Sequence, residues 1–294
     1  CGSDAPGSAP AIGIRVERVP AERAFLVTYD LAVDARALVF KRDRVLFRAQ
    51  SWTPKTGDQT LARRKGKEAI VSSQVTRRFE VLVPENFVEF DYPFMSEFSD
   101  GGIALFTGPL DVVPVACGSS CSDKELRAAV SEAANGPSPP VYLTLVPAPG
   151  QKVIAEGVPG QPLMSATSIS LNPSSQGVIA YFGELEPVPR RGYSVITDPK
   201  LPSWIPPVLD RYLPLIVDLH KRKLGRGPAA PSLIFIPRPT SARRYSSTYS
   251  GAVVGNRMVL ALFGSTWETD TPKVREEFLK LVAHETFHLW NASL

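Results

Sequence analysis

The sequence predicts an α+β protein in which an antiparallel β-region, either a sandwich or a saddle, precedes a region of alternating helices and strands. Two observations support this prediction. Over residues 12–198 the apolar residues form short runs separated by turn-forming residues, which is typical of antiparallel sheets. After residue 199 two long stretches carry apolar residues at helical spacing. We therefore expect a flexible tether over residues 1–11, a β-sandwich domain over 12–198 and a second domain over 199–294.

The β-domain is predicted from β-rich runs, many of them next to glycine, proline or charged turn residues. These runs are 25–29, 38–40, 45–47, 79–83, 103–106, 141–146 and 177–183. A single helix is expected at 123–134, and Asn135-Gly136 after it is a typical helix stop. The 28 prolines in the chain also suit short strands and ordered loops better than long helical bundles.

The second domain should begin with one long helix over 203–224, with Ser203 as its N-cap, Gly225 after its end and a kink at Pro214. Strands are expected at 232–237 and 258–263, with a glycine-rich stretch between them. The last helix should start at Thr271-Pro272, because proline is favoured at the first helical position. Near the end of the long helix, His220 is expected to interact with the helix terminus and not with a metal.

Composition argues against a nucleic-acid-binding protein. Hydrophobic residues make up 44% of the chain and charged residues 21%, and the net charge is only +4. The basic run at 62–67 is interpreted as a solvated loop, with a patch for an anionic partner as the alternative. No apolar stretch approaches the eighteen or so residues that would span a bilayer.

The cysteines indicate an extracytoplasmic protein. Cys1 is followed by a small, polar run rich in glycine, serine and proline, which resembles the mature end of a bacterial lipoprotein. That resemblance implies a lipid on Cys1, attachment to a membrane and a location in the periplasm, at the outer membrane because Gly2 is not aspartate. The alternative is that the sequence is a fragment that starts at a cysteine. Cys117 and Cys121 lie in a Gly/Ser loop that suits a small disulfide, with two free thiols as the alternative.

The residues with the clearest chemistry are His284, Glu285 and His288 in the last predicted helix. Histidines four positions apart lie on one helical face, so both imidazoles can bind one zinc ion. In this arrangement the carboxylate next to the first histidine takes the proton of a metal-activated water as general base. The alternative is a buried helix whose two histidines only form hydrogen bonds.

The sequence from His284 to Asn291 resembles the His-Glu-x-x-His-x-Trp-Asn motif of the glycyl aminopeptidase family, gluzincin relatives of aminopeptidase N. Over the whole chain the resemblance lies in the order of the domains and secondary-structure elements. Matching sequence motifs are confined to about the last sixty residues. It implies that residues 199–294 are the first part of a thermolysin-like zinc peptidase domain. It also implies that Trp290 and Asn291 support the metal ligands.

The sequence departs from the family pattern in two places. Gluzincins take a third zinc ligand, a glutamate, from a following helix, and the sequence stops at Leu294. We therefore expect a C-terminally truncated enzyme whose third ligand and oxyanion stabiliser lie beyond that residue. The family's substrate-binding edge strand corresponds here to Gly251, Ala252, Val253 and Val254, without the acid that binds the substrate amine.

The prediction is a zinc-dependent peptidase, aminopeptidase-like, that hydrolyses peptide substrates. The alternative is a non-catalytic, peptidase-like module that binds peptides or proteins at the cell surface. Glu285 favours the enzyme, because a binding protein needs no base beside the metal.

Overall fold

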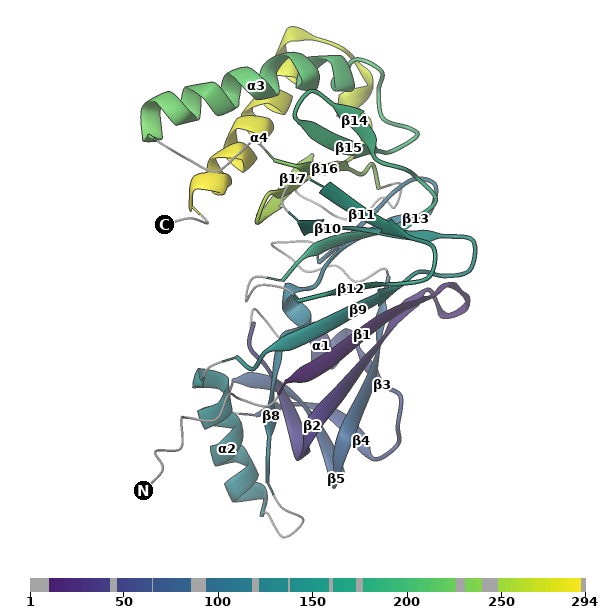
Figure 1. Cartoon of the computed structure of the whole chain (residues 1–294), viewed down its shortest axis with the longest axis vertical. Helices are drawn as coiled ribbons and strands as arrows, with labels where there is room; N and C mark the ends of the chain where they lie inside the picture. Colours follow the sequence, from purple (N-terminus) through teal and green to yellow (C-terminus); the bar gives the residue numbers. More distant parts are fainter. Residues whose placement is uncertain are drawn as a thin grey trace. The chain divides into compact units, whose positions relative to one another are not determined.

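The computed structural model describes residues 11–42, 47–64, 66–85, 94–117, 122–136, 138–158, 161–172, 177–225, 231–239 and 248–291. The chain divides into two compact units: the first comprises 1–87, 107–148 and 167–177, and the second comprises 88–106, 149–166 and 178–294. Each unit combines helices with sheets of mainly antiparallel or mixed strands, so the predicted α+β class is confirmed (Figure 1).

The first unit is built on one eight-stranded sheet. Its strands are β1 (Ile12–Val19), β2 (Ala24–Phe40), β3 (Thr53–Pro54), β4 (Gln59–Arg64), β5 (Lys67–Pro84), β8 (Val112–Val115), β9 (Val141–Val146) and β12 (Ile169–Leu171). The main path through the sheet is β12-β9-β1-β2-β5-β3, with β4 paired to β5 and β8 to β2. All of these pairs are antiparallel except β1 with β9.

Alternating side chains in β1 give one buried face, whereas the end of β2 and the start of β5 are buried on both faces, with Leu126 and Val130 of the helix α2 (Asp123–Asn135) packed against them. In β1 the buried positions are every second residue, beginning at Ile12. Besides α2, the unit contains the short helix α1 (Phe47–Ser51) and the 3₁₀ turns η1 (Pro20–Glu22) and η2 (Gly108–Leu110). Ser122 and Glu125 form a reciprocal capping box that starts α2 where the sequence predicted a helix.

The second unit contains two five-stranded sheets and two long helices. One sheet has the order β11-β10-β13-β7-β6 and the other β14-β15-β16-β18-β17. Their strands are β6 (Met95–Glu97), β7 (Ile103–Phe106), β10 (Lys152–Val158), β11 (Gln161–Ser165), β13 (Ile179–Gly183), β14 (Val188–Arg190), β15 (Tyr193–Thr197), β16 (Leu233–Ile236), β17 (Tyr249–Val254) and β18 (Arg257–Leu262). The helices are α3 (Ile205–Leu224), α4 (Pro272–Asn291) and the 3₁₀ turn η3 (Ser265–Glu268).

The sheet β14–β18 is covered on both faces, which explains why its central strands are apolar without a break. Met258, Leu260 and Leu262 of β18 pack with α3 and α4 in one core cluster. Val259 and Ala261, which alternate with them, pack in a second cluster with residues of the other sheet. A strand buried on both faces needs apolar residues at every position. The helices, this sheet and the second sheet therefore form three layers.

Two expectations about the fold differ from the structure. The expected β-domain of 12–198 is not one sandwich, because β14, β15 and the whole sheet β11-β10-β13-β7-β6 belong to the second unit. Residue 198 therefore lies within this unit, where β15 pairs in parallel with β16. Phe47, expected in a strand, begins the helix α1 instead.

The long helix starts later than expected. Trp204 is the N-cap residue of α3 and makes no side-chain capping bond, whereas Ser203 was the expected cap. Pro206 and Pro207 lie in the first turn. Backbone N–H groups in a first turn have no acceptor within the helix, so proline, which lacks this group, costs no helical hydrogen bond there. None of the helices in the described part of the chain is long and apolar enough to span a membrane.

Candidate metal centre

The helix α4 begins at the predicted residues, Thr271 and Pro272, and its apolar face packs in the core. The Thr271 hydroxyl oxygen accepts a hydrogen bond from the Val274 N–H at 3.2 Å, and Pro272 follows at the first helical position. The apolar side chains of α4 recur at helical spacing and face the core: Phe278, Leu281, Val282 and Leu289 are all buried. The remaining face of the helix is free to carry polar groups toward solvent.

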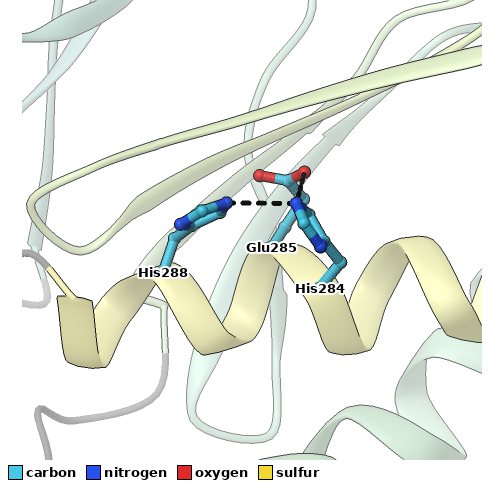
Figure 2. Close-up of side chains that lie close together, drawn as sticks. All are labelled: His284, Glu285 and His288. Atoms are coloured by element: carbon cyan, nitrogen blue, oxygen red, sulfur yellow. Dashed lines mark hydrogen bonds and ion pairs between the residues drawn. The ribbon is translucent and has the colours of Figure 1, made fainter.

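His284 and His288 extend their imidazoles toward each other from successive turns of α4. Their Nε2 atoms are 3.1 Å apart (Figure 2). The side chain of His284 is 67% exposed and His288 is half-buried. Desolvation, followed by the nearby charge of His284, lowers the pKa of His288. These effects favour a neutral His288, and the neutral imidazole is the form that binds metals.

The donor set fits a zinc ion. Two nitrogens that each lie 2.0–2.1 Å from a tetrahedral zinc are about 3.3 Å apart, close to the observed separation of the two Nε2 atoms. His284, Glu285 and His288 form the one group of three or more metal-binding side chains found among the described residues, with ligand atoms within 4.8 Å of one another. The two histidines would hold the ion, and other ligands would have to complete its coordination.

Glu285 lies beside the histidines but points into the protein. Its side chain is only 6% exposed, and its Oε1 is 4.0 Å from Nε2 of His284 (Figure 2). Burial raises the pKa of Glu285 to about 7. The carboxyl group can therefore both accept and release a proton near neutral pH.

The strand β17 covers Glu285. Gly251 is so close to the glutamate side chain that a β-carbon on this glycine would be 2.3 Å from Glu285 Cδ. β17 is the edge strand of its sheet, pairing with β18 and with no other strand in the described part of the chain. In Figure 1 it runs beside α4, drawn in yellow. The expected substrate-binding segment, Gly251 to Val254, therefore lies at an edge next to the histidine–glutamate cluster.

His220 was expected to interact with the end of its own helix, but its described hydrogen bond is to a different helix, α4. Its Nε2 donates a hydrogen bond to the Ala283 carbonyl at 3.2 Å, and its ring lies 5.4 Å from the ring of Trp290. Both contacts join α3 to the end of α4 that carries the cluster. Trp290 is buried in the core cluster that contains residues of α3 and α4. Sequence analysis missed the link to Ala283, because a histidine in a basic helix end does not reveal its partner.

The cysteines are described only in part. Cys117 is disulfide-bonded. Cys1 and Cys121 lie outside the described residues, so the pairing with Cys121 and the lipid on Cys1 stay predictions. The side chain of Asn291 also lies outside them.

A groove of about 760 Å³ lies between α3 and α4, and its lining does not include His284, Glu285 or His288. Its walls include Tyr212, Ile216 and Leu279. At 100° per residue, Leu279 and Glu285 lie on different sides of α4. Lys280 and Ala283 also line the groove, so it reaches the side of α4 next to His284 without including the three side chains of the cluster.

No protein-family model and no curated protein matches this chain. A functional proposal therefore depends on the site's own geometry and on the resemblance of its motif.

Proposed function

We propose that the protein is a zinc-dependent peptidase in which His284 and His288 bind the metal and Glu285 is the general base. The observation that supports this most strongly is the position of Glu285. Its carboxyl group is buried beside two converging imidazoles, yet it is set back from them.

The distances support the role of a base over that of a third ligand. A carboxylate oxygen and an imidazole nitrogen that share one zinc ion are about 3.3 Å apart. The Oε1 of Glu285 lies farther than this from His284 Nε2, at 4.0 Å. The carboxylate is thus close enough to reach a water molecule at the metal without occupying a coordination position.

The bound zinc would acidify water and polarise the carbonyl of the peptide bond. Glu285 would remove a proton from the attacking water and pass it to the departing amine. Burial raises the pKa of Glu285 to about 7 in the metal-free protein, and the positive charge of a bound zinc ion would lower it, which favours the carboxylate form that a general base needs. Among the described strands β17 pairs only with β18, and its other edge offers main-chain groups to which an extended peptide could add as a further strand.

The test uses the full-length product of the gene that encodes these residues. We expect metal analysis to find one equivalent of zinc and the protein to hydrolyse peptides. Comparing peptide substrates with free and with blocked N-termini would define whether cleavage requires a free amine. Glu285→Gln should keep the zinc and lower kcat by at least about 100-fold, because the base is lost and the ligands stay. His284→Ala and His288→Ala should lose the zinc.

The chain's third histidine provides the matched control. His220→Gln should keep the full equivalent of zinc, because His220 contacts the backbone of α4 and not the metal centre. Normal turnover by the Glu285→Gln variant, or full zinc content in the two alanine variants, would exclude the proposed mechanism.

A further inference from the structure

Gly251 lies at the point where β17 faces the candidate base. Side chains of a strand alternate between the two faces of its sheet. Tyr249 and Val253 pack against the core cluster that contains α3 and α4, whereas Val254 packs in the cluster on the opposite face. Gly251 lies two residues from both Tyr249 and Val253, so it is on the same face of the sheet as they are and faces α4.

The side chain of Glu285 occupies the space that a side chain at position 251 would need. A β-carbon at this position would lie 2.3 Å from both Cδ and Oε1 of Glu285 and 2.4 Å from Cγ. The backbone itself does not require glycine, since Gly251 is not among the residues with positive φ. The close approach to Glu285 is therefore the reason why glycine is needed.

We infer that Gly251 is a positioning residue for Glu285: by lacking a side chain it leaves the space in which the carboxyl group is held beside the two histidines. The backbone of β17 then limits the rotamers open to Glu285. The consequence for catalysis rests on the proposed function, but the placement of the side chain does not.

The nature of the close contact predicts what a methyl group would do. The atoms within 2.4 Å belong to a flexible side chain and not to the backbone. The least costly response is for Glu285 to move, while the sheet and α4 stay where they are. Ordinary carbon–carbon contact needs about 3.5 Å or more, so the carboxyl group should move by about 1 Å. A displacement of that size at a reacting group can lower the rate by about 100-fold.

The experiment compares the full-length wild-type protein with Gly251→Ala by crystallography, zinc analysis and steady-state kinetics. We expect Cδ of Glu285 to be displaced by about 1 Å and the zinc content to be unchanged. We also expect kcat to fall by about 10- to 100-fold with little change in KM. In a Glu285→Asp background the same alanine should have little further effect on kcat, because the shorter acid leaves room for the methyl group.

Gly13→Ala is the matched control. Gly13 also lies in a strand without positive φ, but a β-carbon there would lie 3.6 Å from its nearest neighbour, the Asp30 residue, which is ordinary contact. This variant should leave structure and kinetics unchanged.

A Gly251→Ala structure in which Glu285 has not moved would overturn the inference, whatever the activity. A wild-type protein that binds zinc but cleaves no peptide would instead refute the proposed function. In that case the crystallographic comparison would still test the positioning of Glu285.

Discussion

His284 and Glu285 are neighbours in the sequence, but the fold puts them in opposite environments. The side chain of His284 is 67% exposed and that of Glu285 is 6% exposed. Successive residues of a helix point about 100° apart, so one turns to solvent and the other toward β17. A carboxyl group removed from water holds its proton more strongly, which is why the pKa of Glu285 rises to about 7.

This burial makes the stability of the metal-free protein depend on pH. The unfolded chain keeps the ordinary pKa of 4.5 for Glu285, whereas the folded state has a pKa of about 7. Below pH 4.5 both states hold the proton, and between the two values the unfolded state alone loses it. The buried carboxyl group therefore becomes increasingly destabilising as pH rises, by up to about 3 kcal/mol above pH 7.

Glu285→Gln removes that titration, so the metal-free variant should gain stability over the wild type as pH increases from 4 to 8. Urea unfolding of both proteins at each pH measures this gain, with a chelator present to exclude zinc. An equal stability difference at pH 4 and pH 8 would contradict the prediction.

At the scale of elements, α4 is held at its start and near its middle. Its first turn is capped by Thr271, and the Ala283 carbonyl, in the turn that carries His284, accepts a hydrogen bond from His220 of α3. Between these points its apolar side chains pack against the sheet β14–β18. A helix fixed in this way can keep the imidazoles in one arrangement, which a metal centre requires.

Thr271→Ala should destabilise the protein by about 1 kcal/mol, because the N–H of Val274 loses its capping acceptor. Thermal and urea unfolding of the full chain would measure the loss. Thr271→Ser keeps a hydroxyl group at the same position and should retain most of the stability. Equal losses in the two variants would show that the cap does not stabilise α4.

At the scale of the second unit, Asp198 joins three separate segments. Its buried carboxylate accepts hydrogen bonds from the N–H groups of Ser99, Lys200 and Arg238 at 2.7, 2.8 and 2.9 Å, and from the Ser99 hydroxyl. Ser99 lies 99 residues before Asp198, and Arg238 lies 40 residues after it. The residue at which the first domain was expected to end is therefore a central contact in the fold.

Asp198→Ala should destabilise the protein by about 3 kcal/mol, since several buried N–H groups would lose their acceptor at once. Urea unfolding monitored by circular dichroism measures the effect. The exposed Glu184, in the same unit, is the control, and its replacement by alanine should change stability by less than about 0.5 kcal/mol. A similarly small effect at Asp198 would refute its proposed structural role.

The sequence alone determined the features that depend on local spacing and local chemistry. The helix α2 has almost the expected bounds, α4 starts at the Thr271 cap that its sequence indicates, and the apolar run at 258–263 largely coincides with β18. The proximity of His284 and His288 also follows from helical spacing, because residues four apart on a helix must lie close together.

The tertiary structure alone decided the features that depend on residues distant in the sequence. The boundary expected at 198 is absent because β15 pairs with β16, some forty residues later in the chain. The burial of Glu285 and the need for glycine at 251 both arise where β17 packs against α4. Gly251 and Glu285 are more than thirty residues apart in the sequence. Neither could be predicted from composition or periodicity, because both depend on which two surfaces meet when the chain folds. The histidines are therefore placed by the helix, but the environment of the candidate base is made by the strand packed against it.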